Sequence, residues 1–376
     1  MKDLKLLQVV PSLESGGVEQ GTIDLANYIS KKGYCSIVVS NGGRMLNQLN
    51  SKKVQHFKLP VHSKNPLIIY KNIKKIKKII LNNKINLVHV RSRAPSWSVY
   101  YASKNICRSV STFHNVYGYQ NLFKKFYNKG LSKVDKIIAI SEYVKNSISN
   151  IYKINKKKIT VIHRGIDTDL FNSDTNDKIR YSDFFSKYNI PSDKRIILYP
   201  GRLTKWKGQI EFLDILQSLD LNNIVCYFIG DDKNISYKLK LEKEIYKKNL
   251  NLNCKIFGHL SNEEMKLMYK SSELIISAPL KPEGFCRIIS EGLSMKKIVL
   301  CYNNGGPKEQ IFGLDDLYAV EPYDKNQMLK QIKIALNLST MKKKQMGEIA
   351  RQHVLKKFSK LHMLENYFEF YRKINL

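Results

Sequence analysis

KPEGFCRIISEGLSMKKIVLCYNNGGPKEQ, residues 281–310, is the stretch that decides the fold of this chain of 376 residues. It predicts a helix at 290–296 and a short buried strand at 298–302, followed by a turn at 304–307. Glu283 stands in the loop before the helix, and Glu291 follows eight residues later. Such a loop can offer backbone N–H groups to an anionic ligand, and Glu291 can accept hydrogen bonds from ligand hydroxyls. Taken alone, these features fit a surface helix with two solvated glutamates better.

The length and composition predict a two-domain α/β protein of the cell interior. A chain of this length is expected to form two domains of about 150–200 residues each. No apolar run approaches the ~18 residues of a membrane span, and the start MKDLKLLQVV lacks a secretory signal, so we expect a cytoplasmic protein. The six cysteines show no CxxC spacing, and we therefore expect neither a zinc site nor a disulfide framework.

The charge is strongly basic and unevenly distributed. The chain has 64 Lys and Arg against 32 Asp and Glu, a net charge of +32. No acidic residue occurs between Asp24 and Asp135, where 21 lysines and arginines fall. Such a field attracts polyanions, which include nucleic acid, anionic lipid and phosphorylated glycans. A general enrichment in lysine, isoleucine and asparagine explains part of the excess, but not the missing acids.

The first half of the chain reads as a parallel sheet with connecting helices. A strand is followed by Ser15-Gly16-Gly17-Val18-Glu19 and a helical pattern to Ile29, which is a βα unit with a glycine turn. The turn is not GxGxxG, so it does not predict a dinucleotide site. The apolar runs of this half predict strands at 4–10, 36–40, 87–91, 110–113, 136–140 and 159–163.

Two segments of this half combine lysines with apolar residues. Residues 71–84 carry an isoleucine stripe and six lysines, which predicts a helix that packs its stripe on the sheet or lies on a membrane surface. Residues 121–133, NLFKKFYNKGLSK, interleave aromatic and basic residues. This pattern fits an interfacial element or an ordinary amphipathic helix.

The second half contains two cations on a glycine-bounded loop. Residues 200–208, PGRLTKWKG, follow a predicted strand at 196–199 and include Arg202 and Lys207. A guanidinium and an ammonium group supply the fixed positive charge that a diphosphate leaving group needs. Further strands are predicted at 225–230, 254–257, 274–277 and 298–302, after a polar linker at 172–186.

Taken together, these motifs resemble the retaining glycosyltransferases of family 4, which have the GT-B fold. The resemblance runs from Val10 to the end of the chain and keeps the family order. The motifs that carry it are Gly16-Gly17, Thr112-x-His114, Ile140-Ser141-Glu142, 161–167 (VIHRGID), Gly201-Arg202…Lys207-Gly208, Glu283-x7-Glu291 and Gly305-Gly306-Pro307. It differs from the family pattern at Asn115, where the family often has Asp, and at Cys286, where it usually has Gly.

The resemblance implies two Rossmann-like domains whose parallel sheets face a deep interdomain cleft. Residues 1–176 would form the acceptor- and membrane-facing domain, and residues 177–358 the nucleotide-sugar-binding domain. Residues 359–376 would form a helix that crosses back to the first domain. The role of each half follows from the family and not from the composition of this chain.

The resemblance also implies which residues act. The implied catalytic residues are His114, Glu283, Arg202 and Lys207. In the family the first glutamate lies at the donor sugar and the second at the ribose, and a Cβ at Cys286 could narrow the space near the donor. The implied donor-binding residues are Gly16, Gly17, Arg202, Lys207, Gly258, His259, Gly284, Phe285 and Glu291.

The implied reaction moves a sugar from a UDP- or GDP-linked donor to a glycan or glycolipid acceptor, with retention and without cofactor or metal. Asp167-Thr168-Asp169 is formally DxD, but it falls in the segment that closes the first domain. From the basic field we expect a peripheral protein on the inner face of a bacterial membrane, acting in lipopolysaccharide or cell-envelope polysaccharide synthesis. Two alternatives are a GT-B nucleotide-sugar 2-epimerase and a basic nucleic-acid-binding protein, although we find no nucleic-acid recognition module.

Overall fold

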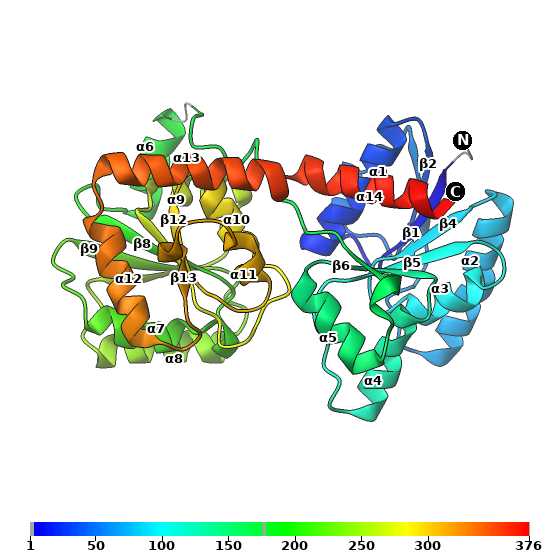
Figure 1. Cartoon of the computed structure of the whole chain (residues 1–376), viewed down its shortest axis with the longest axis horizontal. Coiled ribbons are helices and arrows are strands. Elements are labelled where there is room, and N and C mark those ends of the chain that lie inside the picture. The colour runs from blue at the N-terminus through cyan, green and yellow to red at the C-terminus, as the bar shows by residue number, and fades with distance from the viewer. Residues whose placement is uncertain (1–3, 176–177, 376) are drawn as a thin grey trace. The chain divides into compact units, whose positions relative to one another are not determined.

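The computed structural model describes residues 4–175 and 178–375, and the chain forms two compact units (Figure 1). The first unit contains the chain up to Arg164 together with the segment from Leu361 onward. The second unit runs from Gly165 to Lys360. The sequence placed these limits after residues 176 and 358, and the functional roles of the two units stay a prediction.

The first unit is built on a seven-stranded parallel sheet with the order β3-β2-β1-β4-β5-β6-β7. β1 lies between β2 and β4, with Leu7 in register with Ile37 of β2 and Val88 of β4. Its strands are apolar runs because helices cover both faces of a parallel sheet. The strands are β1 Lys5–Val9, β2 Cys35–Ser40, β3 Val54–Lys58, β4 Leu87–Val90, β5 Arg108–Phe113, β6 Lys136–Ala139 and β7 Ile159–Val161.

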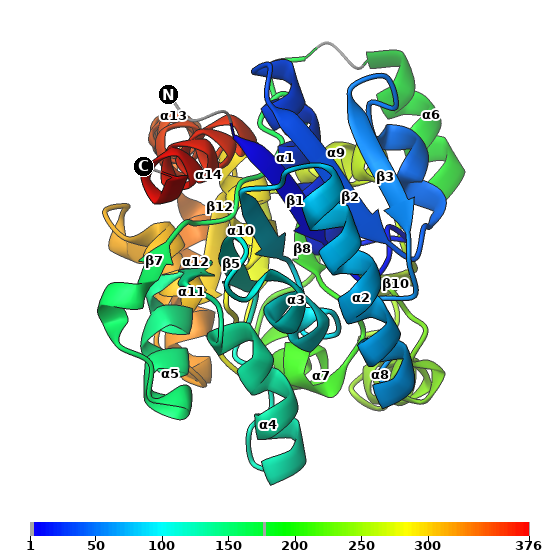
Figure 2. The same ribbon diagram turned by 90° about the vertical axis from the view of Figure 1, so that its right-hand side faces the viewer.

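The helices of the first unit follow its strands and cover the sheet. α2 begins at an Asn65 cap with Pro66 in its first turn, and it lies beside α3 (Figure 2). Its isoleucine stripe is buried while its lysines are exposed, as the sheet-packing alternative expected. The helices are α1 Gly17–Lys31, α2 Pro66–Asn82, α3 Ser96–Ser103, α4 Leu122–Lys129 and α5 Glu142–Tyr152, with short 3₁₀ turns η1 Arg44–Gln48, η2 Gly130–Ser132 and η3 Lys156–Lys158.

The last helix, α14 Lys360–Asn375, also packs on the sheet of the first unit. Met363, Leu364, Tyr367 and Tyr371 share an apolar cluster with residues of β1, α1 and β4. His89 of β4 hydrogen-bonds through Nδ1 to the Tyr371 hydroxyl at 2.5 Å. These contacts explain why a segment at the end of the chain belongs to the same unit as its beginning.

The second unit is built on a six-stranded parallel sheet with the order β10-β9-β8-β11-β12-β13. Here too the central strands are buried on both faces, with β8 between β9 and β11. The strands are β8 Arg195–Pro200, β9 Ile224–Ile229, β10 Cys254–Phe257, β11 Leu274–Ser277, β12 Ile298–Tyr302 and β13 Ala319–Val320.

The helices of the second unit alternate with these strands. α9 begins with a capping box, in which Ser261 and Glu264 satisfy each other's backbone N–H groups. The helices are α6 Lys178–Tyr188, α7 Gln209–Gln217, α8 Ile235–Lys247, α9 Asn262–Ser271, α10 Arg287–Ser294, α11 Gly306–Ile311, α12 Lys325–Asn337 and α13 Thr340–Lys357, with 3₁₀ turns η4 Lys205–Lys207 and η5 Asp316–Tyr318.

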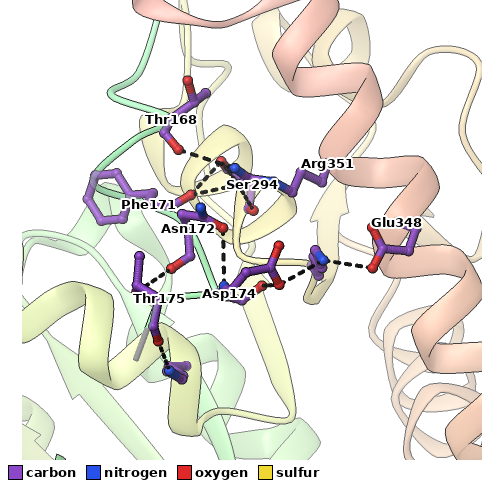
Figure 3. A network of polar contacts seen from close by, with 11 residues as sticks. Thr168, Phe171, Asn172, Asp174, Thr175, Ser294, Glu348 and Arg351 are labelled. Atoms are coloured by element: carbon purple, nitrogen blue, oxygen red, sulfur yellow. Dashed lines mark hydrogen bonds and ion pairs between the residues drawn. The ribbon is translucent and has the colours of Figure 1, made fainter. Parts of the chain in front are cut away.

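The segment 165–175 is fastened to the second unit by polar contacts (Figure 3). The Arg351 guanidinium of α13 donates to the carbonyls of Phe171 at 3.1 Å and Ser294 at 2.7 Å. The Ser294 hydroxyl also donates to the Phe171 carbonyl at 2.7 Å. Lys296 binds Asp174 at 2.8 Å. This network explains why the second unit begins at 165, earlier than the sequence pattern suggested.

Three sequence expectations need correction. Much of the polar segment 172–186, expected as a linker, is helix α6, because Phe184 on its inner face is buried in the second core. The turn expected at 304–307 ends early, since α11 begins at Gly306 with Pro307 in its first turn. The short strands β3 and β13 were not predicted, because their apolar runs are too brief to stand out.

Candidate active site

The loop after β8 places Lys207 inside the second unit. Gly208 has φ +80°, and a Cβ there would come within 2.5 Å of the Ala278 carbonyl oxygen, so only glycine allows this close approach. The Tyr199 hydroxyl donates to the Lys207 carbonyl at 2.7 Å. The Trp206 ring lies 4.8 Å from the Lys207 Nζ. The loop is therefore held by contacts on both sides of Lys207.

Lys207 and Glu283 form a buried ion pair. The Lys207 Nζ lies 2.7 Å from the Glu283 Oε1, and the residues are only 8% and 9% exposed. Burial acts to lower the pKa of Lys207, while the Glu283 charge and hydrogen bond raise it, and the net effect is a raised pKa. Two residues that the sequence predicted separately, 76 positions apart, are thus direct partners.

Arg202 lies on the same loop but is exposed. Its backbone carbonyl accepts from the Gln209 side chain at 3.0 Å, which fixes the start of the loop. Its positive charge is close enough to act to lower the pKa of Lys207. Among the described residues, no hydrogen bond or ion pair engages the Arg202 guanidinium. That guanidinium is therefore available to an anionic ligand.

The backbone at Glu283 is held by the glycines that follow β12. The Gly306 N–H donates to the Glu283 carbonyl at 2.8 Å, and Glu283 and Gly305 form a parallel β-bridge. A Cβ on Gly306 would come within 2.3 Å of the Gly284 carbonyl oxygen. Phe285 packs against Phe358 at 6.0 Å between ring centres. The glycines after β12 are thus structural supports for Glu283 and Gly284.

Glu291 is buried with two partners that the sequence did not reveal. Its Oε2 accepts from the Tyr269 hydroxyl at 3.0 Å, and its Oε1 pairs with Arg287 at 2.8 Å. Burial first, and then the Glu291 charge, raise the pKa of Tyr269 well above its usual value, so the phenol stays a donor. Each carboxylate oxygen keeps a free lone pair, so Glu291 can still accept a ligand hydroxyl.

Cys286 caps α10 and faces inward. Its N–H donates to the Gln310 Oε1 at 3.1 Å, and the Gln310 amide donates back to the Cys286 carbonyl at 3.0 Å. The thiol lies 3.4 Å from the Ser277 hydroxyl. Burial and then the Glu283 charge raise the pKa of Cys286 to about 12, so the thiol is protonated. Its N–H is already satisfied, so the amide that immediately precedes α10 is not free for a ligand.

The segment after β10 carries the residues predicted to meet a nucleotide base. Gly258 is half-buried, and a Cβ there would lie 3.6 Å from the Asp232 carboxylate. His259 is exposed. Asp232 itself pairs with Lys238 at 2.9 Å. His259 is thus accessible to solvent, while Gly258 lies next to the Asp232 carboxylate.

The other predicted residues lie in the first unit, at the carboxyl ends of its strands. Gly16, with φ +118°, precedes α1, and the Gly17 carbonyl accepts a hydrogen bond from Arg164. His114 follows β5, and both of its ring nitrogens are buried. Burial, then Arg164 and Arg91, lower the pKa of His114 well below its usual value, so its ring is neutral at pH 7.

A cavity of about 570 Å³ in the first unit lies elsewhere. Its lining includes Asn86, Lys104, Arg108 and Lys133, which stand at or before the amino ends of β4, β5 and β6. His114 follows the carboxyl end of β5, the edge where α/β folds bind ligands. The cavity is therefore not part of the predicted site.

The DxD-like segment does not gather acidic ligands. Asp167 pairs with Lys360, and that interaction lowers its pKa against the opposing effect of burial. In the described part of the chain, no group of three or more His, Cys, Asp or Glu is arranged to hold a metal ion. No helix within residues 4–175 and 178–375 has the length and apolarity needed to cross a bilayer.

Comparison with known proteins identifies the two halves separately. Residues 15–170 match Glycosyltransferase Family 4, and residues 181–353 match Glycosyl transferases group 1. The structure superposes on a glycosyltransferase from Rickettsia africae with a TM-score of 0.90 and 36% identity, covering 100% of this chain and 99% of that one. It also superposes on Anabaena HepE in complex with UDP-glucose, at TM-score 0.82 and 17% identity, over 98% of this chain and 100% of that one.

A curated relative is the lipopolysaccharide 1,2-N-acetylglucosaminetransferase of Salmonella typhimurium. It is 24% identical over 231 residues, which is 60% of this chain and 58% of that transferase. The match therefore spans little more than half of that relative. The superpositions confirm the predicted α/β architecture with two parallel sheets, that of the GT-B fold.

Proposed function

Because this chain belongs to glycosyltransferase family 4 and transfers a sugar from a nucleotide-sugar donor, we propose that its acceptor is a lipid-linked glycan of the bacterial cell envelope. The acceptor would be a lipopolysaccharide core or a related glycolipid. The acceptor named for the Salmonella relative, lipopolysaccharide, supports this choice. The enzyme would work as a peripheral protein on the inner face of the membrane.

The observation that carries the donor half of the mechanism is the buried Lys207–Glu283 pair beside the unpaired guanidinium of Arg202. Charge accumulates on the diphosphate as the glycosidic bond breaks. Cations that are already fixed stabilise this charge without reorganising during the reaction. Glu283 holds the Lys207 ammonium in place, and Arg202 offers a planar fork for phosphate oxygens.

The two carboxylates would have different tasks. Glu283, next to the cations, would meet the hydroxyls of the donor sugar, and Glu291 the ribose. Gly258 and His259 would contact the base through their backbone, while Gly284 and Phe285 would line the donor sugar. Gly16 and Gly17 would contact the donor through their backbone.

The transfer itself retains the anomeric configuration. The acceptor oxygen would form its bond to the anomeric carbon on the face that the diphosphate leaves. The bond from that carbon to the phosphate oxygen breaks, and the same phosphate oxygen takes the acceptor proton. His114, neutral at pH 7, would hydrogen-bond near the reacting carbon without carrying charge. No protein nucleophile is needed in this scheme.

The proposed membrane contact rests on an exposed apolar surface around α4. Leu122 and Phe123 are 81% and 87% exposed, and Phe126 is 65% exposed. Trp97 of α3 stacks on Phe126 with ring centres 5.1 Å apart. Leu122 was not singled out from the sequence. Tyr127, which was expected to join the contact, is half-buried, so it cannot insert as Phe123 can.

Exposed lysines surround this surface. Lys124, Lys125 and Lys129 of α4 are exposed, as are the lysines of α2. Each lysine near an anionic leaflet contributes about 1 kcal/mol of attraction. A few such residues with shallow insertion of Leu122 and Phe123 would give reversible binding.

The activity is tested by screening UDP- and GDP-sugars for release of nucleoside diphosphate. The release should accelerate when detergent-dispersed lipopolysaccharide core or another envelope glycolipid is added. Acceleration by soluble sugars but not by any glycolipid would overturn the acceptor proposal.

The membrane contact is tested by liposome flotation. Binding should need anionic lipid, weaken with added salt, and fall when Lys124, Lys125 and Lys129 are changed to Gln together. The matched control changes three exposed lysines of α8, Lys240, Lys243 and Lys247, to Gln. Equal losses in both triple variants would mean that only net charge matters.

A further inference from the structure

The first unit contains a buried guanidinium that lacks an acidic partner. Arg91 follows β4 and is 2% exposed. Its Nε and Nη1 have no hydrogen-bond partner among the described residues. The Tyr367 ring of α14 lies 5.2 Å from the guanidinium carbon, and the Tyr371 hydroxyl of the same helix also interacts with the Arg91 side chain. An arginine cannot discharge itself by losing a proton, so a buried guanidinium needs an anion.

A second guanidinium, that of Arg164, lies close to the same side of α1 as the Arg91 guanidinium. A Cβ on Gly21 would lie 3.2 Å from the Arg91 Nη2 and 3.8 Å from the Arg164 Nη2. A Cβ on Gly17, one turn earlier on α1, would lie 3.0 Å from the Arg164 Nη2. The absence of side chains at Gly17 and Gly21 therefore lets both cations reach one side of α1.

His114 belongs to the same cluster. Arg164 and Arg91 are both close enough to lower its pKa, and an interaction with the Arg91 backbone acts in the opposite direction. A neutral imidazole can donate through one nitrogen and accept through the other. The cluster thus places a neutral imidazole close to the unpartnered N–H groups of Arg91.

Two further titratable residues, Glu19 and His89, lie close to this cluster. Glu19 interacts with Arg164, and burial raises its pKa despite that interaction. His89 of β4 is occupied by Tyr371 and by the Thr112 hydroxyl at 2.7 Å.

We propose that Arg91, with Arg164 and His114, binds an anionic group of the acceptor, a carboxylate or a phosphate. The proposal rests on the proposed function, because it assigns the cluster to the acceptor of that reaction. The planar guanidinium of Arg91 has unused N–H groups on Nε and Nη1, which point in different directions, and each can donate one charge-assisted hydrogen bond to an anion oxygen. The donor diphosphate already has Arg202 and Lys207, in the second unit.

Inorganic phosphate is the probe for the site itself. The Arg202→Gln background removes the exposed cation of the donor loop, and the thermal midpoint is followed as phosphate replaces chloride at constant ionic strength. We expect a saturable rise of at least about 2 °C in Arg202→Gln and none in Arg202→Gln/Arg91→Met. An equal rise in both proteins would overturn the proposal.

Arg91→Met also separates a binding role from a structural one. Methionine fills similar space without an unpaired charge, so in chloride the variant should be at least as stable as the parent. A lower midpoint in chloride would show that Arg91 has a structural partner, against the proposal. If Arg91→Met fails to fold, NMR of Arg202→Gln tests the proposal instead. The His114 ring resonances should shift saturably with added phosphate, while those of His353 in the second unit should not shift.

The source of the anion is decided by two further measurements. Arg91→Gln should keep the affinity for UDP or GDP within about twofold, because a group that meets only the acceptor contributes nothing to nucleotide binding. A tenfold loss of nucleotide affinity would assign the cluster to the donor and overturn the acceptor proposal. With a pair of acceptors that differ by one carboxylate or phosphate, wild type should prefer the anionic one at least tenfold and Arg91→Gln should not.

These outcomes are distinct from failure of the proposed function. If no envelope glycolipid accepts sugar but anionic soluble sugars do, the lipid-linked acceptor is wrong and the anion site stands. If glycolipids accept sugar with no preference for an anionic group, the lipid-linked acceptor stands and the anion site is wrong.

Discussion

Changing Lys207 to Met separates the catalytic and structural contributions of one ion pair. Methionine keeps the length of the aliphatic stem beside Trp206 but leaves the Glu283 carboxylate buried without its 2.7 Å partner. Removing one member of a buried pair costs about 3–5 kcal/mol of unfolding free energy. Because both side chains keep about a tenth of their surface exposed, we expect a value near the lower limit, about 3 kcal/mol.

The same change should also slow transfer. Loss of a preorganised donor at a developing charge costs about 2.7–4 kcal/mol, so kcat/KM should fall by about 10²-fold or more. Arg202→Ala should produce a similar kinetic loss but alter the unfolding free energy by less than about 0.5 kcal/mol, since Arg202 is exposed. Lys205→Ala, on the same loop, is the control for both measurements.

The pH dependence gives a third readout. The pKa of Lys207 is raised in the folded state, so its stabilising effect is complete below the unfolded value of about 10.5 and is lost only as the pH rises through the folded value. Lys207 should thus contribute equally to stability at pH 5 and pH 8.

Urea unfolding at the two pH values and steady-state kinetics with the identified donor make up the assay. The reasoning is refuted if Lys207→Met is as stable as Lys205→Ala, or if Arg202→Ala is destabilised as much as Lys207→Met. Wild-type turnover in Lys207→Met would refute the catalytic part alone.

Three further predictions concern the carboxylates, a glycine and the membrane surface. Glu291→Gln should mainly weaken nucleoside diphosphate binding in calorimetry, whereas Glu283→Gln should mainly slow transfer; equal losses of affinity would show that the assignment is wrong. Gly306→Ala should destabilise the protein by about 1–3 kcal/mol, because its Cβ would lie 2.3 Å from the Gly284 carbonyl oxygen, and an unchanged urea midpoint would contradict this close approach. Phe123→Ser should reduce flotation with anionic liposomes without changing the thermal midpoint, since its side chain is 87% exposed, and unchanged flotation would remove Phe123 from the membrane surface.

The parallel sheets were predictable because their signals are local. Strands β10, β11 and β12 have the predicted limits, and most others differ by one or two residues. An apolar run between glycines or polar turns identifies a buried strand without knowledge of its neighbours. The order of the motifs along the chain was enough to indicate the family and its fold.

The partners of the predicted residues were not predictable in the same way. Lys207 and Glu283 were each singled out from their own motif, but nothing local indicates that they touch. Tyr269 gives no signal that it donates to Glu291. The proposed roles of all these residues stay predictions.

The sequence by itself therefore determined the two-domain α/β architecture, the family and the candidate residues, because periodicity, turn chemistry and motif spacing are properties of short segments. Only the tertiary structure decided which groups are buried and which are paired. Arg91 looks like any other arginine of a basic chain until β4, α1 and α14 enclose it. Burial and pairing depend on segments far apart in the chain. The free energy of a charged group rises when water is removed from around it, unless a partner compensates the charge.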